Sequence, residues 1–110
     1  GWAAAEWIMM IRNLFVREEA DQLIIGSGMF PRWLETGETL VFGPTLAGGG
    51  RITVRLRQPD GEGPVFVDIE AAGVDPDTQY RIQVPGFTPR NVTGAREGIR
   101  LEPEFEGAAV

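Results

Sequence analysis

The stretch RITVRLR, residues 51–57, alternates polar and apolar side chains without a break. Because successive side chains of a β-strand point to opposite faces, Ile52, Val54 and Leu56 are expected to face a core while the intervening side chains face water. The stretch VFVDIE, residues 65–70, alternates in the same way, and the turn signal Pro59-Asp-Gly61 stands between the two runs. The sequence therefore predicts a β-hairpin over residues 51–70.

Burial of both apolar sets on one face also predicts the pairing register of this hairpin. With a six-residue turn at residues 58–63, the expected core pairs are Leu56 with Val65, Val54 with Val67 and Ile52 with Ile69. On the outer face the same register sets Arg55 against Phe66 and Arg51 against Glu70. A cation over a ring and an opposite-charge pair would then support the hairpin from outside.

The rest of the chain after residue 20 is built from short extended runs separated by turns. The 110 residues include 15 glycines and 8 prolines, which favours many turns over long helices. Further strands are expected near residues 22–25, 38–42, 79–84 and 98–101, with a helical turn at residues 31–34 in which Trp33 caps one end of the core. We expect an antiparallel β-sandwich of about six strands over residues 21–102 and a flexible tail over residues 103–110.

One N-terminal α-helix is expected to precede the sandwich. Residues 2–19 contain no Gly or Pro, and apolar side chains recur at helical spacing. Besides a broad apolar face, Trp2, Met9 and Val16 form a second apolar patch on the other side of this helix. Since the residues that follow can cover only one side, the pattern predicts that a partner contacts the second patch.

Composition excludes several classes of function. With no Cys and no His, the chain has no disulfide, no ordinary zinc site and no histidine-activated nucleophile. A net charge of -6 and scattered basic residues argue against nucleic acid as a partner. The longest apolar run, residues 7–11, is far too short to span a membrane. No cofactor is indicated, and nothing in the sequence indicates a compartment.

Paired carboxylates are the catalytic apparatus that this composition still allows. The acidic pairs at residues 60–62 and 75–77 lie in turns, and Asp68 and Glu70 fall on the outward face of a strand. We therefore expect solvated carboxylates and no catalytic residue in this chain. Residues 75–79 resemble the start of a calcium loop, but the glycine and the final acid that such a loop needs are missing, so no metal site is expected.

Carbohydrate binding commonly uses exposed aromatic rings that stack on sugar faces. The candidates here are Trp33, Phe66, Tyr80 and Phe87. The alternative for each ring is packing in the core or at its rim.

Several segments together resemble a known superfamily. They are GWAAAEWIMMIRNLFVREE at residues 1–19, DQLIIGSG at 21–28, FPRWL at 30–34, and FGPT at 42–45, followed by Gly48 and the strand at 51–57. The first resembles the last helix of the catalytic toroid in six-hairpin glycosidases, which include bacterial α-L-rhamnosidase-like and glucoamylase-like enzymes. The others resemble that superfamily's passage into a small C-terminal β-sandwich. Leu46-Ala47 depart from the usual aromatic residue before the glycine, and Gly49 and Gly50 lengthen the turn.

This resemblance implies a C-terminal piece of a longer protein, with residues 1–20 as the end of a toroid helix. The catalytic acids of such enzymes belong to the toroid upstream, so no active-site residue carries over to this chain. The hypothesis is a non-catalytic accessory domain that braces or shapes an upstream helical catalytic domain. The alternatives are a carbohydrate-binding module that uses exposed aromatics and a structural domain that self-associates through its helix.

Overall fold

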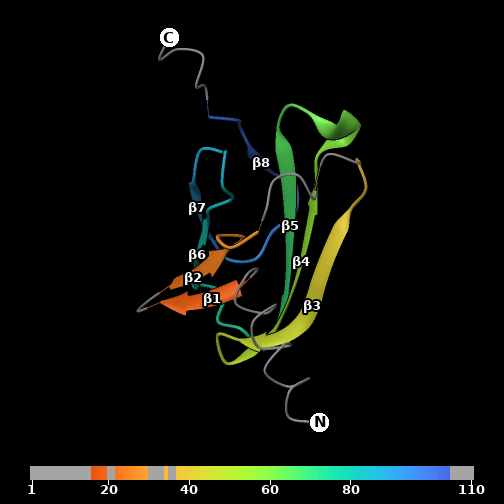
Figure 1. Cartoon of the computed structure of the whole chain (residues 1–110). Coiled ribbons are helices and arrows are strands. Elements are labelled where there is room, and N and C mark those ends of the chain that lie inside the picture. The colour runs from red at the N-terminus through yellow and green to blue at the C-terminus, as the bar shows by residue number, and fades with distance from the viewer. Residues whose placement is uncertain (1–15, 20–21, 30–33, 35–36, 105–110) are drawn as a thin grey trace.

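Two four-stranded β-sheets pack face to face, as Figure 1 shows. The structure, a computed structural model, describes residues 16–19, 22–29, 34 and 37–104. Sheet A contains, in spatial order, β1 (Val16–Glu19), β2 (Gln22–Ile25), β6 (Gln79–Ile82) and β7 (Arg90–Thr93). Sheet B contains β3 (Leu40–Ala47), β4 (Gly50–Arg57), β5 (Val65–Ala72) and β8 (Ile99–Leu101). A 3₁₀ turn, η2 (Pro59–Gly61), follows β4.

The expected mainly β, sandwich-like architecture is confirmed, with two differences in its strands. The prediction of antiparallel pairing holds throughout sheet B, whereas in sheet A β2 and β6 run parallel. The structure also contains two strands that the sequence pattern did not predict, β1 and β7. The predicted range 22–25 coincides with β2, and β3 extends past its predicted end to Ala47.

Residues 16–19 correct the predicted extent of the N-terminal helix, which was expected to continue to Glu19. They form β1, whose Val16 lies opposite Ile25 of β2 and is fully buried. The ladder with β2 and the burial of Val16 outweigh the helical spacing that the local sequence carries. The remainder of the predicted helix, together with Trp2 and Met9, lies outside the described residues.

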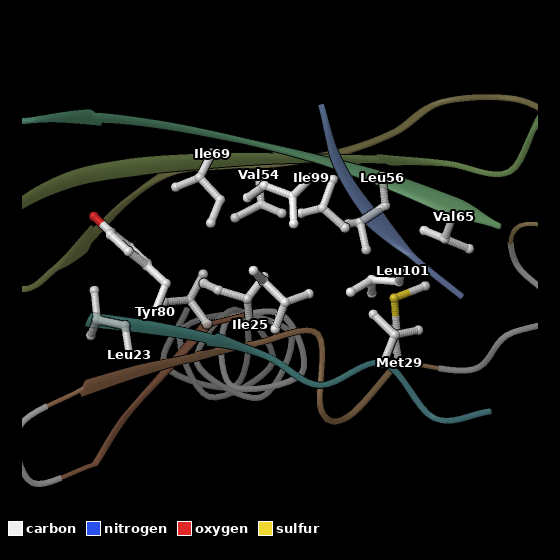
Figure 2. Packing of buried hydrophobic residues seen from close by; sticks show 14 of the residues in the cluster. Leu23, Ile25, Met29, Val54, Leu56, Val65, Ile69, Tyr80, Ile99 and Leu101 are labelled. Atoms are coloured by element: carbon white, nitrogen blue, oxygen red, sulfur yellow. The ribbon is translucent and has the colours of Figure 1, made fainter. Parts of the chain in front are cut away.

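The core fills the space between the two sheets. Figure 2 shows side chains of sheet A, including Leu23, Ile25 and Tyr80, facing Val54 and Ile69 of sheet B. The inward side chains of β4 and β5 are all buried except at Ala71, as their alternation predicted. The sequence pattern therefore identified correctly which face of the 51–70 hairpin meets the core.

The pairing register of this hairpin differs from the prediction by two residues. Leu56 lies opposite Val67, not Val65, and Val54 lies opposite Ile69, not Val67. The connection is longer than expected because Gln58 turns its side chain into it: this side chain is buried, and its Nε2 donates a hydrogen bond of 2.9 Å to the carbonyl oxygen of Gly63. Burial of the apolar face tolerates a two-residue shift, since only an odd shift reverses the faces.

The shift changes the contacts on the outer face of the hairpin. Arg57, not Arg55, lies over the ring of Phe66, with 5.4 Å between the guanidinium carbon and the ring centroid. Arg55, in place of Arg51, forms the ion pair with Glu70, at 3.1 Å. Arg51 instead lies opposite Ala72.

Cysteine pairs test this register directly, because the chain has no cysteine of its own. In the variant Thr53→Cys/Glu70→Cys the two positions are directly opposite, so we expect a disulfide under mild oxidation. In Arg51→Cys/Glu70→Cys the positions are diagonal, about 7 to 8 Å apart, so we expect little cross-link. Mass spectrometry of the oxidised chains measures both yields. A higher disulfide yield from the second pair would contradict the register in the structure and support the one that the apolar pattern predicted.

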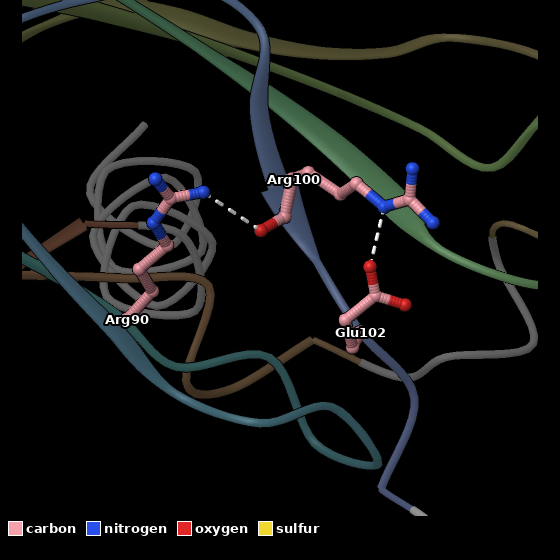
Figure 3. Close-up of polar contacts among 3 residues, drawn as sticks. All are labelled: Arg90, Arg100 and Glu102. Atoms are coloured by element: carbon pink, nitrogen blue, oxygen red, sulfur yellow. Dashed lines mark hydrogen bonds and ion pairs between the residues drawn. The ribbon is translucent and has the colours of Figure 1, made fainter.

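The edge strands β7 and β8 join the two sheets at one side of the sandwich. Figure 3 shows the Arg90 guanidinium of β7 donating a hydrogen bond to the backbone carbonyl of Arg100 in β8, at 3.1 Å, while the Arg100 side chain pairs with Glu102. Nearby, the Glu104 amide donates to the Gly86 carbonyl at 2.9 Å. Residue 104, predicted to lie in a flexible tail, is thus hydrogen-bonded, and residues 105–110 lie outside the described part.

Candidate interaction surface

An open hollow of about 630 Å³ lies on the outer face of sheet B. Its floor carries the polar side chains of Arg51, Thr53, Arg55 and Glu70, from β4 and β5. Its flanks carry small or apolar residues, namely Val41, Gly43, Pro44, Ala71 and Ala72. The hollow therefore combines a charged floor with apolar sides.

An irregularity in β3 leaves this hollow open. The ladder between β3 and β4 shifts register between Phe42 and Thr45, where Gly43 and Pro44 stand. Proline has no amide hydrogen for a ladder, and such positions are typical of bulges and edge strands. Gly43 has φ +113°, and a Cβ on it would lie 2.5 Å from the backbone oxygen of Ile52. The backbone of β3 thus approaches β4 closely, and no side chain at residue 43 fills the space above the floor.

The three outward arginines of β4 differ in how their charges are matched. Arg55 is paired with Glu70 and Arg57 lies over Phe66. Within the described part of the chain, the guanidinium of Arg51 makes neither an ion pair nor a hydrogen bond. Its neighbours across the ladder are Leu46 of β3 and Ala72 of β5. Arg51 is therefore an exposed, unmatched cation between two apolar side chains.

Exposed aliphatic side chains lie on the same face as Arg51. Val41 and Leu46 of β3 are 58% and 71% exposed, and they are the large hydrophobic residues most exposed among those described. They lie opposite Arg55 and Arg51 respectively. We call the set Val41, Leu46, Arg51, Thr53 and Arg55 the β3–β4 face.

Several of the described carboxylates accept hydrogen bonds from backbone amides. Asp68 accepts a hydrogen bond of 2.7 Å from the Gly98 amide, and Asp75 accepts one of 2.8 Å from the Asp77 amide. Glu18 accepts one of 3.0 Å from the Gly48 amide. Among the described residues, no group of three or more acidic, histidine or cysteine side chains is placed to hold a metal ion. In that same part of the chain no helix has the length and apolar character to cross a membrane.

The aromatic residues considered for sugar stacking lie in different environments. Tyr80 is 1% exposed and Phe87 is 6% exposed, so neither ring face is available to a ligand. Phe66 is half-buried at the surface, and Arg57 lies over its ring. Trp33 lies outside the described residues. Val16, predicted to belong to an exposed patch, is fully buried in β1 and cannot contact a partner there.

Sequence reasoning missed the β3–β4 face, although two signals for it are present. The Gly43-Pro44 pair inside an extended run indicates a bulge, and the alternation in residues 51–57 places three arginines on one face. The charge balance of that face depends on the register, which the sequence pattern did not determine.

Tyr80 extends from the core toward a second hollow, of about 280 Å³, which Asp75 and Gly94 also line. Figure 2 shows its hydroxyl at the end of the layer of core side chains. Burial raises the pKa of Tyr80 above its ordinary value.

This raised pKa predicts how stability depends on alkaline pH. The folded chain holds the Tyr80 proton more tightly than the unfolded chain, so its contribution to stability is complete below about pH 10 and is lost as the pH rises through the folded pKa. Tyr80 is the chain's single tyrosine, so the near-ultraviolet absorbance of tyrosinate reports its ionisation alone. We expect ionisation at higher pH in the folded chain than in denaturant, and coincident curves would contradict the burial of this hydroxyl.

Comparison with protein-family models, with curated proteins and with solved structures gives no match.

Proposed function

We propose that this chain is a non-catalytic β-sandwich accessory domain of a longer, glycoside-hydrolase-like protein. In this proposal it packs against an upstream helical catalytic domain, which it braces or whose cleft it helps to shape. The observation that carries the accessory role is the β3–β4 face, which combines exposed aliphatic side chains with an unmatched arginine. The glycosidase context rests on the resemblance of residues 1–56.

The composition of the β3–β4 face supports a contact with another protein surface. Arginine is enriched at protein interfaces, and arginines that become desolvated on binding often dominate their energetics. Leu46 beside Arg51 and Val41 beside Arg55 supply apolar area that a partner can bury. The hydrogen bonds that Asp68, Asp75 and Glu18 make to backbone amides support a structural role for these carboxylates.

Carbohydrate binding is the second candidate, and the polar floor of the hollow favours it. Arg51, Thr53 and Glu70 supply donors and acceptors of the kind that bind sugar hydroxyls. Of the aromatic rings expected to provide stacking, Phe66, Tyr80 and Phe87 do not line this hollow, and Trp33 lies outside the described residues. Within the described lining, hydrogen bonds would therefore hold a sugar.

Three measurements test the accessory role. The reading frame upstream of the codon for Gly1 should encode a helical domain, and a frame that begins near Gly1 would contradict the proposal. The 110-residue chain should hydrolyse no aryl glycoside and give no saturable shift of its amide resonances with neutral oligosaccharides. Saturable shifts confined to β3, β4 and β5 would favour the carbohydrate-binding alternative, and hydrolysis would overturn both.

A further inference from the structure

We propose that the β3–β4 face docks an extended acidic segment of a protein partner, with Arg51 as the residue that binds its carboxylate. This inference rests on the proposed function in one respect, since the segment is expected to belong to the neighbouring domain of the same protein. Beyond that function, the partner is acidic and Arg51 recognises it.

The charge of the β3–β4 face differs from that of the chain as a whole. The net charge is -6, and all of the basic residues are arginines. Glu70 already neutralises Arg55 at 3.1 Å, whereas no described residue neutralises Arg51. Guanidinium binds carboxylate and phosphate groups through two parallel hydrogen bonds, so an unmatched arginine favours a partner that carries such a group. The complementary partner is therefore acidic.

The surroundings of Arg51 indicate that the acid is accompanied by apolar side chains. Leu46 and Ala72 lie on either side of Arg51 across the ladder, and Val41 lies further along β3. A partner that buries Leu46 and Val41 also removes water from Arg51, which strengthens the attraction between its guanidinium and a carboxylate. An isolated small anion would leave those aliphatic side chains exposed.

The geometry of β4 fits an extended segment. Side chains on one face of a strand recur at about 6.8 Å, so an extended partner that lies along β4 presents its alternate side chains at the spacing of Arg51, Thr53 and Arg55. One carboxylate then meets Arg51, and the side chain two residues along the partner lies near the Thr53 hydroxyl.

The test uses the 110-residue chain and a defined probe, an acetylated pentapeptide with leucine first and last, glutamate in the middle and serine between them, so that the acid and both leucines lie on one side of the extended peptide. Amide chemical shifts are followed during titration, at low and at high salt. We expect saturable shifts over β3, β4 and β5, weaker binding at high salt, and no binding of the matching lysine–leucine peptide. No saturable shift with the glutamate peptide would overturn the proposal.

Two variants identify the residue responsible. Arg51→Gln should weaken the binding at least about tenfold, since the paired guanidinium supplies the charge-assisted hydrogen bonds. Arg17→Gln is the matched control, because Arg17 is an exposed arginine of sheet A whose charge is already paired with Glu19 at 3.5 Å. Equal affinities of wild type and Arg51→Gln would overturn the proposal. Thermal melts show whether both variants retain the fold.

Other occupants of the β3–β4 face would give distinct results. If an oligogalacturonate gives saturable amide shifts on this face and the peptide does not, the occupant is an acidic saccharide and not a protein. If the amide shifts on this face change with the concentration of the chain alone, the occupant is a second copy of the chain and not a protein partner. Either result would overturn the inference.

The inference and the proposed function can fail separately. If the peptide does not bind but the upstream frame encodes a helical domain, the accessory role stands and the docking chemistry is wrong. If the peptide binds through Arg51 but the reading frame begins near Gly1, the docking chemistry stands and the partner is a separate protein.

Discussion

Leu56→Ala is expected to lower the free energy of unfolding by about 2 to 5 kcal/mol. Leu56 is fully buried on β4, opposite Val67 and Leu40, so truncation removes apolar contacts and leaves a cavity between the two sheets. Chemical denaturation monitored by circular dichroism measures the loss.

Leu46→Ala is the matched control, because it makes the same chemical change on the outer face of the same sheet. Its side chain is 71% exposed, so we expect a loss of less than about 1 kcal/mol. If Leu46→Ala cost as much as Leu56→Ala, the assignment of inner and outer faces in sheet B would be wrong.

Gly43→Ala is expected to destabilise the chain by about 2 to 4 kcal/mol, from two causes that act together. The backbone has φ +113°, which side-chain-bearing residues rarely adopt, and the added methyl would lie 2.5 Å from the Ile52 oxygen. Because that oxygen belongs to the β4 backbone, relief requires β3 and β4 to move apart. The same denaturation experiment measures this loss.

Gly49→Ala separates the two causes. Gly49 also has a positive φ, +84°, but a Cβ there would meet nothing within 4 Å. We expect this variant to lose about 1 kcal/mol, from backbone strain alone. Losses of equal size at the two positions would mean that β3 does not approach β4 closely at the bulge.

Alternation along the chain determined the faces of the hairpin but not its register. Any even shift keeps Ile52, Val54 and Leu56 on the core side, so the apolar pattern is satisfied by several registers. The connection between β4 and β5 selects one of these registers. In it, the buried Gln58 side chain donates a hydrogen bond to the Gly63 carbonyl. A glutamine hydrogen-bonded inside a turn leaves no periodic signal in a sequence.

The same two-residue shift explains why the candidate surface could not be predicted. In the register expected from the sequence, Glu70 lies against Arg51 and neutralises it. In the structure Glu70 pairs with Arg55, and Arg51 is left between Leu46 and Ala72. The outward direction of Arg51 could be predicted from alternation, but its unmatched charge depends on the turn chemistry.

The two unpredicted strands depend on tertiary contacts. In β1 the residues at 16–19 carry helical spacing, and burial of Val16 beside β2 overrides it. In β7 a single side chain, Val92, is buried, so the segment has no alternation long enough to recognise. Its ladder with β6 is supported by the side-chain pair Gln79 and Thr93, with Gln79 Nε2 donating to the Thr93 hydroxyl at 2.9 Å.

In the intact protein we expect an acidic neighbour to cover the β3–β4 face. Labelling of arginine by phenylglyoxal, read by mass spectrometry, tests it because all basic side chains here are arginines. We expect Arg51 to react readily in the isolated chain and to be protected in the full-length gene product, while Arg17 reacts in both. Equal reactivity of Arg51 in the two proteins would contradict it.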